Sequence, residues 1–307
     1  MKKIVVLLFA VLLTFGLFAC GEKEFAVDGE FLAYEVSVSR NAPQVTFVTV
    51  TIEDGEIAGY NIDVRQGTRT GDGAEVAYAW AWNAKTKKEL GDDYGMGAVS
   101  EIGKEWYEQA ASIEAFWLEN GVEAMTKDED NVIDNVTGVS IKDAYSSVAL
   151  AAIENAKAGK FVAIYSSGTD LYSAEMTLTK KGEIDTLVLD VLQSTRDAVT
   201  GTFTWRTETK QELGDDYGMK GAGGYVFENG AWKSEGTTTL EWYEQVALIT
   251  DYVKANGWSD SLQPVAQRGG SLDGTTLIAE LAGATIRTGG YYTVLKSLFQ
   301  FAGDSVK

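Results

Sequence analysis

Two nearly identical segments organise this sequence: TKKELGDDYGM at residues 86–96 and TKQELGDDYGM at residues 209–219 differ at a single position. A second pair follows in the same order, since EWYEQAASIEAFWLENG begins at Glu105 and EWYEQVALITDYVKANG begins at Glu241. Matching segments that recur in one order indicate a tandem duplication. The sequence therefore predicts two copies of one structural unit.

The spacing of the paired segments locates the boundary and an insertion. LGDDYGM recurs after 123 residues, from 90 to 213, and EWYEQ recurs after 136, from 105 to 241. The second copy therefore holds 13 additional residues, which we place in the Gly-rich and aromatic stretch 221–236. We expect repeat 1 over residues 31–159 and repeat 2 over residues 160–307, with the boundary near Gly159.

Each copy shows a strand, a hairpin, the LGDDYGM loop and two helices. Alternating β-branched residues around Asp54-Gly55 and Lys181-Gly182 predict the hairpins, and the strands are expected at residues 31–38, 45–52, 57–64, 161–165, 173–179 and 184–192. Apolar residues at helical spacing predict helices from Glu105 to Asn120 and from Glu241 to Asn256. Further helices are expected at residues 141–158 and 289–302. Because strands and helices are segregated, each copy should be an α+β unit with an antiparallel or mixed sheet and two helices.

The N-terminus has the pattern of a bacterial lipoprotein signal peptide. Lys2 and Lys3 precede an apolar run at residues 4–18, and Ala19-Cys20 follows. The run is short for a membrane-spanning helix, which needs about 20 apolar residues. We expect residues 1–19 to be removed, Cys20 to be lipidated, and residues 20–30 to link the body to the outer face of the cytoplasmic membrane. An ordinary signal peptide cleaved nearby and an uncleaved anchor are the alternatives.

Composition excludes several classes of function. A single cysteine forms no internal disulfide, and the absence of histidine excludes Ser-His-Asp triads, Cys-His pairs and His-bearing zinc sites. A surface hydrolase is therefore disfavoured. The net charge of −19 becomes −21 once Lys2 and Lys3 are removed, and so acidic a chain disfavours nucleic acid as a partner.

Three features together resemble the FMN-binding domain family, in particular the bacterial surface lipoproteins with two such domains that act as extracellular flavin electron carriers. These are the DGEI-like turn at residues 54–57, the GDDYGM loop followed by the EWYEQ helix, and a small-residue motif before the final helix of each copy. In flavinylated members of the family that motif reads Asp-x-x-Ser/Thr-Gly-Ala-Thr, and the phosphate of FMN esterifies its Thr. The resemblance implies FMN as the cofactor, with a flavin transferase and a membrane electron donor as partners.

Each copy matches the attachment motif in part. Repeat 1 keeps Asp134, Thr137 and Gly138, whereas Val139 replaces the Ala and Ser140 replaces the acceptor Thr. Repeat 2 keeps Gly283, Ala284 and Thr285, whereas Ala279 and Ala282 replace the Asp and the Ser or Thr. The resemblance therefore implies covalent FMN at Thr285 in preference to Ser140.

A hydroxyl at the start of a helix is a reasonable phosphate acceptor, because free backbone N–H groups and the helix dipole stabilise an anion there. Ser140 with Asp143 is also a helix-capping box, which explains Ser140 without a cofactor. The isoalloxazine ring would then contact neighbouring aromatic residues, namely Trp106, Tyr107, Trp242, Tyr243, Tyr291 and Tyr292. The competing interpretation assigns the aromatic stripe from Trp106 to Trp117 to the hydrophobic core.

The acidic residues of the LGDDYGM loops also allow two interpretations. Asp92, Asp93, Asp215 and Asp216 have the chemistry to bind calcium, although the EF-hand spacing is absent. Alternatively, the loop is a structural turn that anchors the following helix, which its glycines favour.

Two functions follow as hypotheses. The first is an extracellular electron carrier anchored by a lipid on Cys20, which is a carrier rather than a turnover enzyme. The second is a ligand-binding or scaffold lipoprotein on the same fold that has lost flavin attachment.

Overall fold

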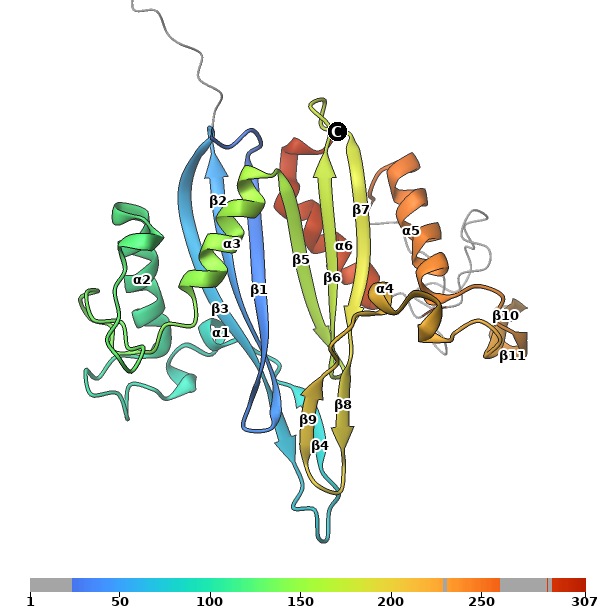
Figure 1. Cartoon of the computed structure of the whole chain (residues 1–307), viewed down its shortest axis with the longest axis horizontal. Coiled ribbons are helices and arrows are strands. Elements are labelled where there is room, and N and C mark those ends of the chain that lie inside the picture. The colour runs from blue at the N-terminus through green and yellow to red at the C-terminus, as the bar shows by residue number, and fades with distance from the viewer. Residues whose placement is uncertain (1–23, 229–230, 260–285, 287–288) are drawn as a thin grey trace, which may run out of the picture.

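The computed structural model describes residues 24–228, 231–259, 286 and 289–307 and shows an α+β fold (Figure 1). The strands are β1 (Gly29–Ser39), β2 (Ala42–Glu53), β3 (Glu56–Thr70), β4 (Ala79–Trp82), β5 (Lys160–Ser167), β6 (Asp170–Leu178), β7 (Ile184–Leu192), β8 (Ser194–Asp197), β9 (Thr202–Trp205), β10 (Gly223–Glu228) and β11 (Ala231–Thr237). The α-helices are α1 (Lys87–Leu90), α2 (Trp106–Asn120), α3 (Ser146–Lys157), α4 (Lys210–Leu213), α5 (Trp242–Asn256) and α6 (Gly289–Ala302). The short 3-10 helices are Gly91–Tyr94, Val122–Ala124, Gly214–Tyr217 and Gly303–Ser305.

All paired strands are antiparallel, and the predicted hairpins are confirmed. The two larger sheets have the orders β1-β2-β3-β4 and β5-β6-β7, and β8-β9 and β10-β11 form two-stranded sheets. The turn between β2 and β3 places Asp54 at φ 56° and Gly55 at φ 79°, which suits the turn that joins two strands. The carboxylate of Asp28 accepts both N–H groups of this turn, at 3.1 and 2.9 Å, and so fixes its geometry.

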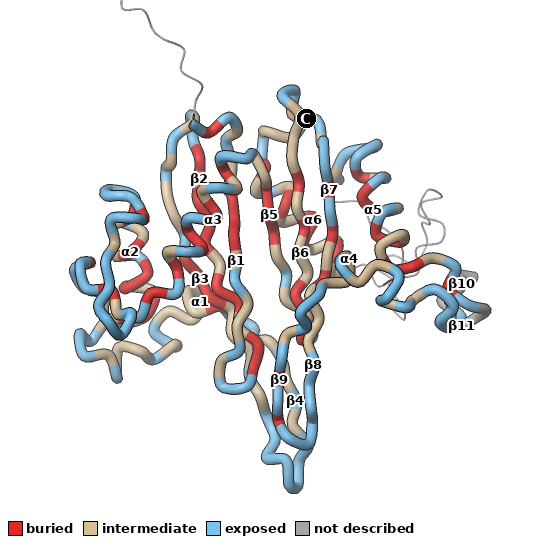
Figure 2. Tube along the Cα trace, viewed as in Figure 1, coloured by how far each residue is buried: buried red, intermediate tan, exposed pale blue. Residues whose placement is uncertain are grey.

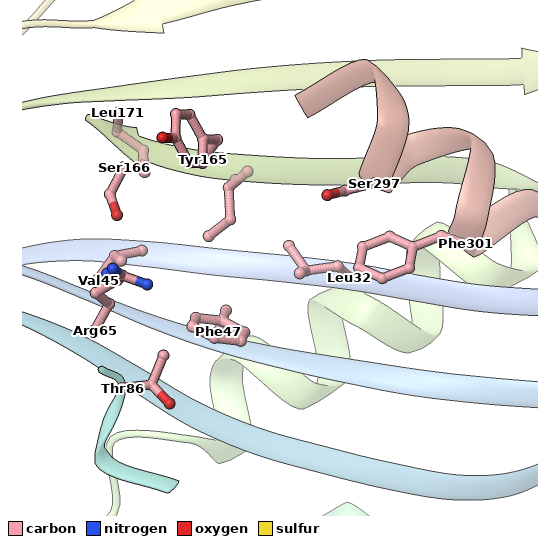
Figure 3. A pocket seen from close by; sticks show the side chains of 11 residues that line it. Leu32, Val45, Phe47, Arg65, Thr86, Tyr165, Ser166, Leu171, Ser297 and Phe301 are labelled. Carbon is pink, nitrogen blue, oxygen red and sulfur yellow. The ribbon is translucent and has the colours of Figure 1, made fainter. Parts of the chain in front are cut away.

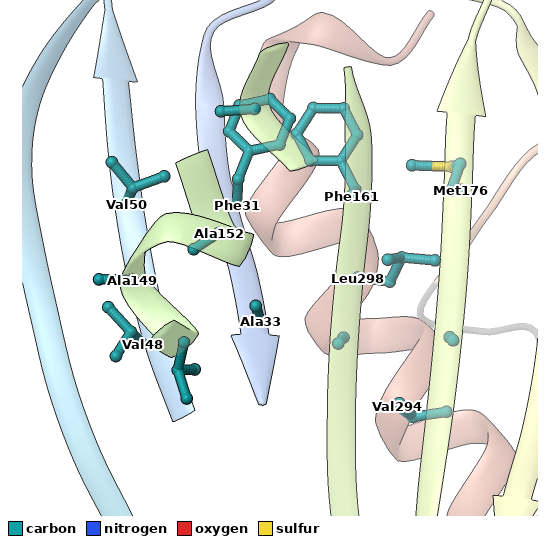
Figure 4. Packing of buried hydrophobic residues seen from close by; sticks show 14 of the residues in the cluster. Phe31, Ala33, Val48, Val50, Ala149, Ala152, Phe161, Met176, Val294 and Leu298 are labelled. Carbon is teal, nitrogen blue, oxygen red and sulfur yellow. The ribbon is translucent and has the colours of Figure 1, made fainter. Parts of the chain in front are cut away.

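The two sheets lie side by side, with β1 next to β5 (Figure 1). Helix α3 packs on β1 and β2, and α6 packs on β5 and β6. Phe31 and Phe161 stack where the sheets meet, with ring centroids 4.5 Å apart, and both side chains are fully buried (Figure 4). The buried apolar residues of both halves therefore form one continuous cluster, which Figure 2 shows as buried stretches along the central strands.

The outer strands of the two halves also meet, at the lower end of the view in Figure 1. The backbone N–H of Tyr78 donates to the carbonyl of Ala198 at 2.9 Å, and Arg69 Nη1 donates to the carbonyl of Gly201 at 2.7 Å. The rings of Trp82 in β4 and Trp205 in β9 lie 6.0 Å apart. These contacts connect the halves at a second place, away from the stacked phenylalanines.

The helices after the LGDDYGM loops begin and end as predicted. Glu105 and Glu241 are the N-cap residues of α2 and α5, and Gly121 and Gly257 terminate them with positive φ. The nearly identical segments 86–96 and 209–219 contain the four-residue helices α1 and α4, each followed by a 3-10 turn. Within the stretch that holds the additional residues of the second half, β10 and β11 form a hairpin.

The prediction that a helix begins near Ile141 is wrong, because α3 begins at Ser146. The backbone at Ile141 and Lys142 pairs instead with the segment before it: Ile133 N–H donates to the Ile141 carbonyl, and Lys142 forms a bridge with Val132. Asp143 then accepts the N–H groups of Tyr145 and Ser146. Asp143 therefore caps α3, and Ser140 is not its N-cap.

The predicted signal segment 1–19 and the lipidation site Cys20 lie outside the described residues. Within the described part of the chain, no helix has the length and apolar character needed to cross a bilayer.

Candidate functional site

The LGDDYGM loop is held by Glu105, the N-cap residue of the helix that follows it. The carboxylate of Glu105 accepts the backbone N–H groups of Met96 and Gly97, each at 2.8 Å. Its own N–H donates to the carboxylate of Glu108 at 2.8 Å, which completes a capping box. The interpretation of this loop as a structural anchor for the helix is confirmed.

The second half repeats these contacts atom for atom. Glu241 accepts the N–H groups of Met219 and Lys220, each at 2.8 Å. The tyrosine after each helix start donates to the first aspartate of its loop, Tyr107 to Asp92 at 3.2 Å and Tyr243 to Asp215 at 3.0 Å. These hydrogen bonds to carboxylates raise the pKa of both phenols. Nowhere in the described residues do three or more Asp, Glu or Cys side chains gather as a metal site would require.

A lysine lies over aromatic rings beside each loop, and we call these groups the Lys–aromatic clusters. In the first half, Lys87 Nζ lies 5.1 Å from the ring centre of Tyr94 and 5.3 Å from that of Trp106. Trp106 Nε1 donates to the hydroxyl of Tyr145 at 3.0 Å. The second cluster consists of Lys210, Tyr217, Trp242 and Tyr291, with lysine-to-ring distances of 4.9 and 5.5 Å and a Trp-to-Tyr hydrogen bond of 2.8 Å.

Burial shifts the titration of the first cluster. Desolvation lowers the pKa of Lys87 to about 8, and Asp63 opposes this shift only in part. Desolvation also raises the pKa of Tyr145 to about 12, so its hydroxyl stays neutral and remains the acceptor for Trp106. Lys87 is therefore the residue of this cluster whose charge changes near neutral pH.

The aromatic residues at the helix starts belong to the core. Only 1% of Trp106, 1% of Trp242 and 2% of Tyr291 is exposed. The interpretation of the stripe from Trp106 to Trp117 as core is confirmed. The expectation that Trp106 offers its face to a flavin ring is wrong, because neighbouring side chains already cover it.

The loop that carries the attachment motif of the first half lies against the start of α2. The Ser140 N–H donates to Gln109 Oε1 at 2.9 Å, and the amide of the fully buried Gln109 donates to the Lys104 carbonyl at 3.2 Å. Gly138 has φ 79°, and a Cβ there would come within 2.4 Å of Lys104 Nζ. Only glycine therefore lets the Lys104 ammonium approach this loop so closely.

The other motif residues of the first half are exposed. Thr137 lies on the surface, and Asp134 accepts a hydrogen bond of 2.5 Å from Thr126 Oγ1. Sequence reasoning missed Lys104 and Gln109 as neighbours of the motif, and Lys87 and Tyr94 as members of the first Lys–aromatic cluster. The Gln of EWYEQ and the Lys of the Thr-Lys pair recur in both halves, and that recurrence was the available signal.

The motif of the second half, with Gly283, Ala284 and Thr285 preceded by Ala279 and Ala282, lies outside the described residues. The residue that follows it, Ile286, is 6% exposed, and Ile141 after Ser140 is 7% exposed. The isoleucine after each motif is thus buried in the same cluster.

Two of the cavities formed by the described residues lie near the sheets. The smaller, of about 150 Å³, lies between the halves and is lined by Leu32, Phe47, Arg65, Tyr165 and Phe301 among others (Figure 3). The larger, of about 770 Å³, opens beside Lys87 and Tyr94 and reaches the β1–β2 turn. Its lining is mostly polar, unlike that of the smaller cavity.

No protein family and no curated protein matches the chain. Among solved structures, the chain is similar to a protein from Clostridium thermocellum whose structure was determined by solution NMR. The two are 24% identical, the match covers 42% of this chain and 91% of that one, and the TM-score is 0.27.

Proposed function

We propose that this chain is an extracytoplasmic, lipid-anchored FMN-binding-like protein that carries electrons outside the cell. The observation that supports it is the loop at Gly138 and Ser140, where a hydroxyl-bearing residue is held by Gln109 and the Lys104 ammonium lies against the adjacent glycine. A phosphate ester needs a hydroxyl for attachment and a cation or N–H donors for its charge. This loop supplies the hydroxyl and the cation together.

The residues present fit the phosphate end of FMN. In this proposal Lys104 neutralises the phosphate, Gly138 lets the Lys104 ammonium approach the loop, and Gln109 holds the backbone of Ser140 in place. FMN, when bound, supplies the redox chemistry, and the protein supplies attachment and surroundings. The flavin ring would lie outside the buried Trp106, on the half-buried face of Tyr94 or Tyr107.

The wider proposal follows from the resemblance and from the repeated segments. We infer that the two halves are copies of one unit and that Thr285 is the attachment residue of the second. A flavin transferase would load the chain and a membrane electron donor would reduce it, while the lipid on Cys20 keeps the acidic body at the outer face of the cytoplasmic membrane.

A labelling experiment tests the proposal. The mature chain is co-expressed with a flavin transferase and denatured, and flavin fluorescence is then measured in the gel. We expect a fluorescent band that Thr285→Ala removes or reduces strongly, whereas Ser140→Ala has the smaller effect. Ser147→Ala is the matched control, because Ser147 is an exposed hydroxyl of α3 that belongs to neither motif. A parent band without fluorescence contradicts covalent attachment.

A ligand-binding or scaffold lipoprotein without flavin is the second candidate. Two observations favour it: Ser140 does not begin a helix, and Trp106 is buried. This candidate expects a parent chain whose mass shows only the lipid modification and whose melting temperature does not change with added FMN. Either flavin labelling or stabilisation by FMN would argue against it.

A further inference from the structure

The larger cavity has a composition that the rest of the chain does not share. Arg40, Arg69 and Lys87 all line it, and no Asp or Glu is among the described residues that line it. The chain as a whole contains 45 acidic residues against 26 basic ones. Three cations around one space in so acidic a protein produce a local positive potential, which attracts anions.

Neutral groups contact Arg69 and Lys87. Arg69 donates to the Gly201 carbonyl, and its guanidinium lies 4.6 Å from the ring centre of Tyr78. Lys87 lies over Tyr94 and Trp106, and Arg40, on the turn between β1 and β2, forms no ion pair with any described residue. None of the three is thus neutralised by a salt bridge within the described chain.

The cations also disfavour one another. Arg40 contributes to the lowered pKa of Lys87, although burial is the larger cause. An anion between them would remove this repulsion and favour protonated Lys87. Gln44 and Gln66 line the same cavity, and the Gln66 amide donates to Gln44 Oε1 at 2.7 Å, so hydrogen-bonding groups accompany the charges.

The second half has lost this arrangement. The β5–β6 hairpin is shorter, because Ser167 pairs with Asp170 directly at the turn, whereas Ser37 pairs with Gln44 two pairs before its turn, so Arg40 has no counterpart in the second half. Where Gln66 donates to Gln44, Gln193 donates to Asp170 at 3.5 Å, so an acid occupies the position of Gln44. Arg196 corresponds to Arg69, since Ser194 pairs with Trp205 as Gly67 pairs with Trp82. One cation is lost and one acid is gained, so a cationic cavity is a property of the first half.

We propose that this cavity binds a small polar organic anion that carries at least two negative charges as carboxylate or phosphate-ester groups. Its volume of about 770 Å³ falls within the range of small-molecule sites, roughly 300–1,000 Å³, and exceeds what a lone inorganic anion needs. Arg40 and Arg69 bind the charged groups, Lys87 adds a third contact, and Gln44 and Gln66 bind polar atoms between them. The proposal uses none of the flavin-motif residues and does not depend on flavin attachment.

Calorimetric titration of the mature chain, made without a flavin transferase, tests this site. Citrate probes carboxylates, ribose 5-phosphate probes a phosphate ester, and ribose is the neutral control. We expect one molecule of citrate or ribose 5-phosphate to bind per chain, with no binding of ribose. Arg40→Gln removes a cation from the site, and Gln44→Asp adds a carboxylate that repels the anion. Each should weaken binding about tenfold or more. The anion that binds more tightly shows whether the site prefers carboxylates or a phosphate ester.

The matched control is Arg196→Gln, which removes the corresponding exposed cation of the second half and should change the affinity by less than about twofold. Melting curves show whether each variant is folded, and Arg40 lies on an exposed turn where a substitution is tolerated. The proposal is overturned if neither anion binds at about 10 mM, which corresponds to negligible affinity. Equal weakening by Arg40→Gln and Arg196→Gln would overturn it too, because attraction would then come from general surface charge.

Discussion

Lys87 carries a positive charge at a partly buried position, and this has a consequence for stability. Its pKa falls from 10.5 to about 8 on folding, chiefly through desolvation. Below pH 8 both the folded and the unfolded chain are protonated there, so the full cost of the buried charge is present. Between pH 8 and 10.5 the folded chain loses the proton first, and the contribution of Lys87 to stability rises with pH.

Substitution of Lys87 by Met should therefore stabilise the chain at pH 7. A shift from 10.5 to about 8 corresponds to about 3 kcal/mol at most, and loss of the cation–π contacts offsets about 1 kcal/mol of it. We expect a net gain of about 1–2 kcal/mol in the free energy of unfolding, measured with urea. The gain should shrink as the pH approaches 10.5.

Lys85→Met is the control for this substitution. Lys85 is 56% exposed and lies 4.0 Å from the exposed Asp93, so its removal should change stability by less than about 0.5 kcal/mol at either pH. If Lys87→Met destabilises the chain at pH 7, the ring contacts outweigh the cost of burial and the argument for Lys87 is wrong.

At the scale of a residue, Gln109 shows which structural roles could be predicted from the sequence and which could not. Its place in the repeated EWYEQ segment was visible, and so was the apolar stripe formed by Trp106, Ala110 and Ile113. What the segment did not reveal is that Gln109 is itself buried and uses its carbonyl to hold Ser140, which lies 31 residues away. The hydrogen-bond partner of a polar residue inside an apolar stripe is set by the tertiary structure. The spacing of residues along the helix does not predict it.

At the scale of elements, Glu105 and Glu241 each join a loop to a helix through two charge-assisted hydrogen bonds. Substitution of either residue by Ala leaves two N–H groups without their acceptor, and each variant should lose about 1.5–3 kcal/mol of stability. Because the contacts in the two halves have the same lengths, we expect similar losses for the two variants. Chemical denaturation measures both.

Glu119→Ala is the control for this pair, since Glu119 is an exposed residue near the end of α2 and caps nothing. It should change stability by less than about 0.5 kcal/mol. A loss at Glu105 no larger than that at Glu119 would show that water replaces the carboxylate and that the loop does not depend on it.

Element boundaries were predictable where a local signal marked them. Asp54-Gly55 fixed a hairpin turn, and Gly121 and Gly257 ended helices, because each acts through its own backbone. The start of α3 was not predictable in this way. The S-x-x-D pattern at Ser140 is the usual capping signal, but bridges to Val132 and Ile133 keep the following residues extended until Asp143 caps the helix.

For the whole molecule, the stacked pair of Phe31 and Phe161 predicts how the chain unfolds. Because the buried cluster is continuous across both halves, we expect a single cooperative transition by calorimetry. Phe161→Ala should remove about 3–5 kcal/mol of stability and lower that single transition as a whole.

Phe203→Ala is the matched variant, because Phe203 is also buried but packs against Trp205 in the outer strands. Phe203→Ala should lower the free energy of unfolding, and the chain should still unfold in one transition. Two resolved transitions in the parent chain would contradict the prediction and would mean that each half unfolds independently.

Helices α3 and α6 each contact the sheet of the other half, and this has a consequence for how such a chain could arise. Helix α3 also touches β5, and α6 also touches β1, so each half helps to cover the other. A gene that encoded only the first half would leave Phe31 facing water at an open edge. Its product would be expected to associate with a second copy through that edge. If the two halves are copies of one unit, as proposed above, the same reasoning predicts that the single unit would form a homodimer.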